Sequence, residues 1–158
     1  MELVQEVAAL FDRDLTRLEQ ELRAFTDTDA LWVVAPGVSN AAGTLALHLE
    51  GNLREYIGRQ LGHREYTRDR AREFSARAIP QQEILERVGE LRGTIPPVIR
   101  ELAPEALAEA YPEPYNGAAI TTQQFLLHLL SHFNYHLGQI DYLRRFVTGA
   151  GAIQLATL

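Results

Sequence analysis

Apolar residues recur every three or four positions over long stretches of the chain, which is the spacing of one face of an α-helix. Between Glu2 and Phe25 such positions are separated by charged and polar residues, and they predict a first amphipathic helix. A loop over residues 26–40 follows, and the side chain of its Trp32 is predicted to pack against one end of the core and close it.

The second helical pattern extends from about Asn40 to Gly62. Ser39 or Asn40 can cap its first turn, and glycine suits the position after a helix. His48 and Asn52 fall on its predicted inward face, among leucines. A buried polar side chain is costly unless a partner satisfies it, so both side chains are expected to have one.

The third helix is predicted to open at Pro80, because proline suits the first helical position. Pro96 and Pro97 interrupt its pattern, and an interior proline loses a backbone donor and collides with the preceding turn. We therefore expect a kink, or a restart capped by Thr94, with the helix continuing to about Leu102.

The fourth helix is predicted to start at Thr121, which can form a capping box with Gln124, and to reach about Phe146. Charged residues are frequent over positions 64–78, where a short helix is expected, and prolines mark 103–120 as a loop or short hairpin.

Four long amphipathic segments with little strand signal predict an all-α four-helix bundle. Its long connections permit neighbouring helices to run parallel.

Size and charge narrow the class of protein. A length of 158 residues suits one domain, 1–158, with a full core. The formal charge of −6 disfavours nucleic acid as a partner, because phosphate contacts need a concentrated positive surface. No apolar run approaches the roughly 20 residues that span a bilayer, and the N-terminal stretch is acidic where a signal peptide is basic. We therefore expect no membrane partner and a cytoplasmic location.

The chain contains neither cysteine nor lysine, since all 15 basic residues apart from histidine are arginine. Thiolate ligands, thiol nucleophiles, Schiff-base chemistry and a phosphate loop with its lysine are therefore excluded. Any metal must be held by nitrogen and oxygen atoms.

Three histidines stand four residues apart in the fourth predicted helix: His128, His132 and His136. Residues i and i+4 lie one above the other on a helix, so two of these rings can direct nitrogens at one metal ion. His48, on the inward face of the second helix, is the natural third ligand, whereas His63 falls at a helix end and is left out. Because metal sites in bundles use side chains from facing helices, the pattern predicts a three-histidine site.

The spacing leaves several points open. It does not decide between His128 and His136 as the partner of His132. Three imidazoles leave positions for water or substrate, as in catalytic sites, and they suit zinc, nickel, iron or copper. The competing interpretation is that the histidines are hydrogen-bonded core residues or a partly exposed stripe, with no metal.

Residues around the predicted site can support it. Phe133 stands where HExxH metalloproteases carry a glutamate base, so the base lies elsewhere or a metal-bound hydroxide itself reacts. Asn52 and Gln139 can hold a water or orient the ligands, although hydrogen bonding between helices explains them equally well. The arginines of residues 68–74 can receive a carboxylate or phosphate at the mouth of the site, but such a charge run is more often a solvated helix face.

Three stretches together resemble the DinB-like superfamily of bacterial metal-dependent proteins: LALHLEGNLREYIG around His48, RDRAREF, and SHFNYHLGQIDYLRR around His132 and His136. They extend over nearly the whole chain in the order of that family. The resemblance implies a four-helix bundle with up-down-down-up topology and metal ligands at His48, His132 and His136, with His128 as a neighbour of the site. It also implies a homodimer and a divalent transition metal such as nickel or zinc.

Some members of this superfamily are S-transferases or isomerases that use low-molecular-weight thiols such as bacillithiol or mycothiol. The leading hypothesis is therefore a metal-dependent enzyme that activates a thiol or water toward a small-molecule substrate, as a thiol S-transferase or a hydrolase. The alternative is a non-enzymatic bundle that binds a metal or a partner, with a structural or sensing metal.

Overall fold

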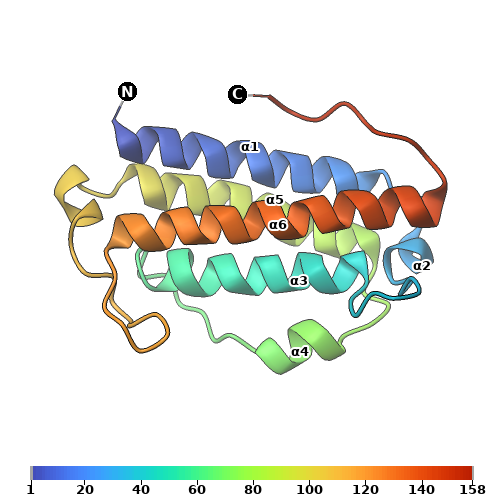
Figure 1. Cartoon of the computed structure of the whole chain (residues 1–158), viewed down its shortest axis with the longest axis horizontal. Coiled ribbons are helices and arrows are strands. Elements are labelled where there is room, and N and C mark those ends of the chain that lie inside the picture. Colours follow the sequence, from blue (N-terminus) through green and yellow to red (C-terminus); the bar gives the residue numbers. More distant parts are fainter. Residues whose placement is uncertain (1, 158) are drawn as a thin grey trace.

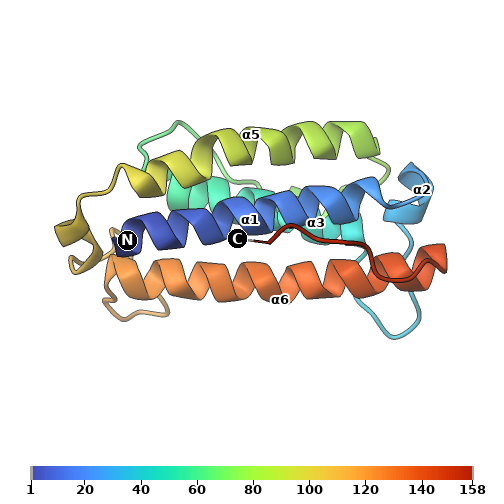
Figure 2. The ribbon, with the colours of Figure 1, turned by 90° about the horizontal axis from the view of Figure 1, so that it is seen from above.

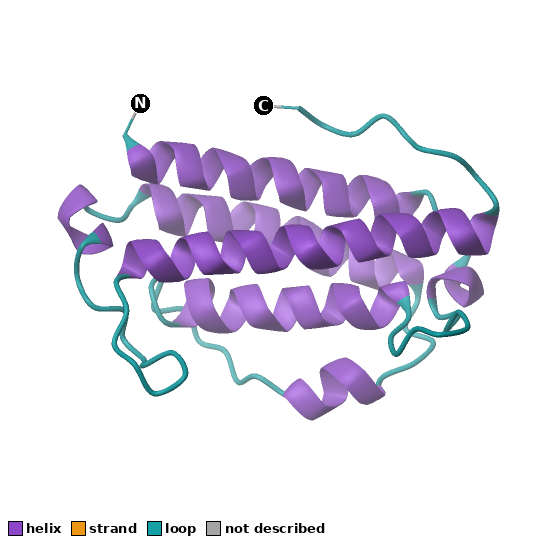
Figure 3. Ribbon diagram, viewed as in Figure 1, coloured by secondary structure: helices purple, strands orange, loops and turns teal. Residues whose placement is uncertain are grey.

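Four long helices pack lengthwise in the computed structural model, which describes residues 2–157 (Figures 1 and 3). The long helices are α1 (Leu3–Arg23), α3 (Ala42–Leu53), α5 (Gln81–Arg100) and α6 (Thr122–Thr148), and the short ones are α2 (Thr28–Leu31) and α4 (Arg70–Ser75). No strand occurs within residues 2–157. The all-α class expected from the sequence is confirmed.

The direction of the helices follows an up-down-down-up order. α1 and α6 run one way along the bundle, and α3 and α5 run the other way (Figures 1 and 2). α1 packs on α5 and α6, and α3 packs on the same two helices. The parallel pair α3 and α5 needs a long crossover connection, and residues 60–80, which include α4, form it. The predicted bundle topology is therefore confirmed.

α3 is buried on every side, and not only along the single inward face that the sequence predicted. α5 and α6 cover one side of it and α4 covers another. Two glycines make the close packing possible: a Cβ on Gly43 would lie 2.9 Å from the Trp32 ring, and a Cβ on Gly51 would lie 2.0 Å from the Glu73 carboxylate. Trp32 packs against the core as expected, and its indole N–H donates to the carbonyl of Ile79 at 3.0 Å.

The start of α3 differs from the prediction, and the second half of the predicted helix is π-helical. Its N-cap is Ala41, which offers no side-chain hydrogen bond, so Ser39 and Asn40 do not cap the helix. Ala41 is fully buried, and the core therefore sets the start of the helix. Beyond Leu53 the chain continues as a π-helical segment, Arg54–Arg59, and the backbone N–H of Gly62 closes its last wide turn on the Ile57 carbonyl at 3.0 Å. π-helical turns are frequent beside functional sites.

α5 passes through Pro96 and Pro97 without a restart, so the restart considered at Thr94 is wrong. The Thr94 hydroxyl donates instead to the Glu90 carbonyl at 2.9 Å. Buried side chains on both sides of the prolines, among them Ile95 and Ile99, hold this segment against the core. Tertiary packing thus outweighs the local preference of proline.

α6 begins as predicted, because Thr121 and Gln124 form the reciprocal capping box. It ends at Gly149, whose φ of +68° lies in the left-handed region that favours glycine. The residues after it return along α1 (Figure 2), where the Ala156 carbonyl accepts a hydrogen bond from the Arg17 guanidinium at 2.8 Å. Among residues 2–157 no helix combines the length and the apolar character that a membrane span needs.

Candidate metal centre

Three histidine rings from two helices meet inside the bundle. α3 supplies His48, and α6 supplies His132 and His136 from successive turns of one face. The Nε2 atom of His132 lies 3.3 Å from Nε2 of His48 and 3.1 Å from Nε2 of His136. One nitrogen from each ring lies within 4.8 Å of the other two. The structure therefore brings together the same three histidines that the resemblance implied.

The His48 ring is held from behind by a buried carboxylate. Its Nδ1–H donates to Oε2 of Glu73 at 3.0 Å, which leaves Nε2 with its lone pair directed at the other two rings. Arg68 in turn donates to both carboxylate oxygens of Glu73, at 2.7 and 3.0 Å. Burial acts to raise the pKa of Glu73, but the hydrogen bonds from His48 and Arg68 outweigh it, and the pKa is lowered. Glu73 is therefore a carboxylate at neutral pH.

Glu73 reaches this position because of the packing of α4 on α3. Asp69 caps α4 by accepting the backbone N–H of Arg72 at 2.9 Å, which fixes the start of this short helix. The side chain of Glu73 then lies against the backbone of Gly51, where a side chain on α3 would stand in its way. The next residue, Phe74, packs against His48, with 5.0 Å between the two ring centroids.

The His136 ring is held in the same manner by a residue of its own helix. Its Nδ1–H donates to Oε1 of Gln139 at 2.7 Å, which again leaves Nε2 free to face the cluster. Burial lowers the pKa of His136, although the hydrogen bond to Gln139 acts in the opposite direction. Gln139, which the sequence indicated as a residue that can orient a ligand, thus contacts one ring of the cluster.

His132 lies between the other two rings and has no such support. Its Nδ1 is buried and has no hydrogen-bond partner among the described residues. Burial, followed by the neighbouring histidines, lowers the pKa of His132 to about 4. The ring is therefore neutral at pH 7, which is the form of imidazole that binds metals.

The hydrogen-bonding of the cluster fits a cation. With protons on Nδ1 of His48 and His136, both of their Nε2 atoms are acceptors, and they face a third ring nitrogen at hydrogen-bond distance. If the proton of His132 is on Nε2, it can be donated to only one of the two neighbouring Nε2 atoms. Nδ1 of His132 is buried and lacks a partner whether or not it carries the proton. A divalent ion among the three Nε2 lone pairs would satisfy all three of these nitrogens, while His132 would keep its proton on Nδ1. Three nitrogen ligands leave positions for substrate.

The other predicted residues take no part in the cluster. The ring of His128 packs on Tyr115 and Phe125, at centroid distances of 4.6 and 5.9 Å, and its own centroid is 6.3 Å from that of His132. Asn52 is buried, but its carbonyl oxygen has no hydrogen-bond partner among the described residues, so the partner expected for it is not found there. His63 is exposed, in agreement with its exclusion.

Glu73 was not singled out from the sequence. It is one of 21 acidic residues and lies in a charge run that suggested a solvated helix face. Arg68, from the same run, is half-buried and forms an ion pair with Glu73, whereas Arg70 and Arg72 are exposed. The sequence feature that pointed to this contact is Gly51, one of the two glycines of the buried helix α3, which leaves room for a side chain from another element.

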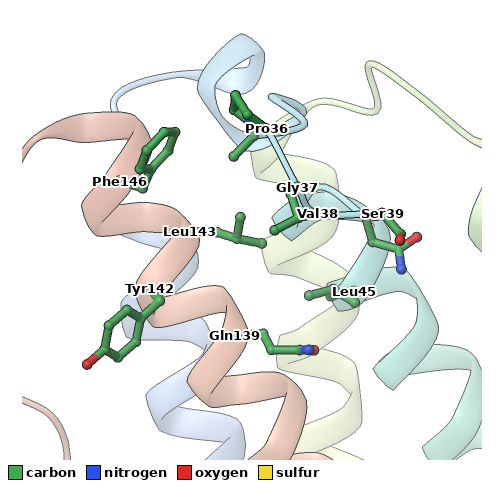
Figure 4. A pocket seen from close by; sticks show the side chains of 11 residues that line it. Pro36, Gly37, Val38, Ser39, Leu45, Gln139, Tyr142, Leu143 and Phe146 are labelled. Carbon is green, nitrogen blue, oxygen red and sulfur yellow. The ribbon is translucent and has the colours of Figure 1, made fainter.

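Two hollows each include a residue that supports the cluster, Gln139 in one and Arg68 in the other. One has a volume of about 530 Å³ and lies between the loop 35–40 and the C-terminal half of α6 (Figure 4). Gln139 belongs to its wall and also holds His136. The other opens at the opposite end of α3, where Tyr56, Arg59, Arg68 and residues of the crossover connection line it.

Comparison with known proteins gives one family and one fold relative. A family model described as mycothiol-S-transferase matches residues 6–149. A crystal structure of a DinB-like protein from Bacillus cereus ATCC 10987 superposes with a TM-score of 0.72 over 92% of this chain and 93% of that one, at 17% identity. At that identity the likeness shows the fold alone. A search of curated proteins gives no match.

Proposed function

Because the chain belongs to the mycothiol S-transferase family, we propose that it is a metal-dependent S-transferase that joins a low-molecular-weight thiol to a small electrophile. The single observation that supports this most strongly is the convergence of the Nε2 atoms of His48, His132 and His136. Nickel or zinc suits three neutral imidazoles with open positions. When bound, such an ion supplies a positive charge that lowers the pKa of a thiol toward the reactive thiolate.

The surrounding residues hold the histidines in the required state. Glu73 and Gln139 fix the proton of His48 and of His136 on Nδ1, and they thereby direct both Nε2 lone pairs inward. The Phe74 ring and the buried flanks of α3 limit the access of water to His48. A site of low polarity strengthens the attraction between a cation and a thiolate.

The placement of carboxylates favours thiol transfer over hydrolysis. A hydrolase of this kind needs a base for the attacking water, and Phe133 occupies the position of the glutamate in HExxH enzymes. Glu73 contacts the cluster but is committed to His48 and to Arg68, so it orients a ligand and does not accept protons from substrate. Thiol transfer would not need that base, because a thiol bound to a divalent ion at the three histidines would lose its proton more readily.

The test is a conjugation assay on protein purified without a histidine tag and loaded with nickel or zinc. Mycothiol, bacillithiol and cysteine are each offered with monochlorobimane, and fluorescence reports the thioether. We expect turnover with one of the larger thiols, loss of turnover in His136→Ala, and retention in the matched control His128→Ala. Turnover of esters without any thiol would establish a hydrolase instead. Absence of both activities, with less than about a tenth of an equivalent of bound metal, would contradict the proposal.

Two expectations from the sequence accompany this proposal. The homodimer implied by the resemblance is tested by analytical ultracentrifugation of the metal-loaded protein. The cytoplasmic location agrees with the use of small intracellular thiols, and fractionation of cells that produce the protein tests it. A dimer that binds metal but lacks every activity would support the non-enzymatic alternative.

A further inference from the structure

The cavity beside Gln139 has the size and the wall of a small-molecule pocket. Its volume of about 530 Å³ falls within the roughly 300–1,000 Å³ typical of ligand sites. Its wall is mostly apolar and includes Pro36, Val38, Leu45, Leu143 and Phe146 (Figure 4). Among the described residues that line it, none carries a charge. A charged ligand would lose its hydration there without gaining a partner.

The cavity shares Gln139 with the histidine cluster, because this residue lines the cavity and holds His136. His136, Gln139 and Leu143 follow one another on one face of α6 at intervals of three and four residues. On α3, Leu45 lies about one turn before His48. Because α3 and α6 run in opposite directions, the residues after His136 on α6 and the residues before His48 on α3 lie toward the same end of the bundle (Figure 1). A molecule in the cavity therefore lies next to the cluster.

The hollow on the other side has the opposite character. It is lined by Arg59, Arg68 and Arg70 together with tyrosine and glutamate side chains, and Arg68 connects it to the cluster through Glu73. A low-molecular-weight thiol is a polar, hydrated molecule, and the charged hollow can replace its water with hydrogen bonds. The apolar cavity is then left for the second substrate.

We propose that the cavity walled by Val38, Leu45, Leu143 and Phe146 binds the electrophile, and that this electrophile is small, uncharged and largely apolar. The inference rests on the proposed S-transferase function. Gln139 adds one polar contact: its Oε1 accepts from His136, and its amide N–H groups have no hydrogen-bond partner among the described residues. Figure 4 shows its side chain extending across the cavity toward Leu45. It can donate to a polar atom of the electrophile.

The reaction at this site is a displacement when the electrophile carries a leaving group. With monochlorobimane, the thiol sulfur forms a bond to the chloromethyl carbon, and the carbon–chlorine bond breaks with its electron pair on chloride. The thiol proton passes to the solvent buffer. The cavity contributes by holding the carbon beside the thiol, since proximity alone accelerates such steps.

Two matched variants test the assignment. Val38→Trp places a large ring into the cavity, whereas Val33→Trp places the same ring at a valine of the same 42% exposure that does not line it. In the conjugation assay we expect Val38→Trp to raise the KM for monochlorobimane by about tenfold or more and to leave the KM for the thiol unchanged. Val33→Trp is expected to resemble the parent protein in both constants. A rise of the KM for the thiol instead would reverse the assignment of the two hollows and overturn the proposal.

A binding measurement separates this proposal from the proposed function. The neutral dye N-phenyl-1-naphthylamine, added to the metal-loaded protein, reports an apolar site by its fluorescence without any reaction. Loss of dye binding in Val38→Trp but not in Val33→Trp supports the pocket even where no thiol is conjugated. Equal dye binding by the two variants overturns the proposal. So does the conversion of a dimer to a monomer by Val38→Trp alone in sedimentation, because a second copy of the chain would then cover this surface.

Discussion

Gly51 of α3 lies so close to Glu73 of α4 that a Cβ on the glycine would stand 2.0 Å from the carboxylate oxygen Oε1. The same carboxylate accepts the Nδ1 proton of His48 at 3.0 Å through its other oxygen. The absence of a side chain at position 51 thus determines where the acceptor for His48 is placed. α3 and α4 pack around this contact, and the histidine ring is oriented as a result.

Gly51→Ala is expected to displace Glu73 and to weaken metal binding by about 10- to 100-fold, the usual effect of losing the group that orients a ligand. Overpacking should also cost about 1–3 kcal/mol of unfolding free energy. Competition with a chromophoric chelator and urea denaturation measure the two effects. The control is Gly89→Ala in α5, where a Cβ meets nothing within 4 Å and should stabilise the helix by about 0.5–1 kcal/mol. Equal metal affinity in the two variants would contradict the role of Gly51.

Glu73→Ala should lower metal affinity by a similar factor, about 10- to 100-fold, because His48 loses the partner that holds its tautomer. Glu83→Ala removes an exposed partner of Arg87 and should leave metal affinity unchanged. The double variant Gly51→Ala/Glu73→Ala is the sharper experiment. In that background the added methyl group has no carboxylate to displace, so metal affinity should equal that of Glu73→Ala alone. Additive losses would mean that Gly51 acts in another way.

Thermal unfolding with and without metal identifies the ligands. Saturating zinc or nickel, at about a thousand times its dissociation constant, should stabilise the parent protein by about 4 kcal/mol, and a chelator should remove this gain. His48→Ala, His132→Ala and His136→Ala should each lose the gain in melting temperature. His128→Ala should keep it, since that ring packs on Tyr115 outside the cluster. Loss of the gain in His128→Ala, with retention in His48→Ala, would refute the assigned ligand set.

A second buried polar cluster determines stability far from the histidines. Arg144 of α6 is fully buried, donates to Glu21 of α1, and also reaches Asp141 at 3.1 Å. Arg144→Met leaves the carboxylate of Glu21 without its partner in the core and should cost about 3–5 kcal/mol in urea denaturation. Replacing both residues by apolar ones should restore most of that loss. The exposed pair of Arg23 and Glu19 is the control, and Arg23→Ala should cost less than about 1 kcal/mol.

Several predictions from the sequence depended only on local geometry, and those agree with the structure. The start of α6 follows from Thr121 and Gln124, whose side chains cap the helix three residues apart. The stripe of His128, His132 and His136 on one face of α6 follows from the pitch of one helix. The restart at Thr94 failed because contacts of Ile95 and Ile99 with other helices decide whether the helix continues through the prolines.

The sequence by itself determined the four helices and the stripe of histidines on α6, because hydrogen bonds and side-chain spacing within one helix repeat along the chain. Only the tertiary structure decided that His136 and not His128 joins His132 and His48 in the cluster, and that Glu73 supports the cluster from the crossover connection. These contacts join residues far apart in the chain, since Glu73 follows His48 by 25 residues and His132 follows it by 84. Their distances depend on how α3, α4 and α6 slide and rotate against one another, and packing of whole faces sets that register.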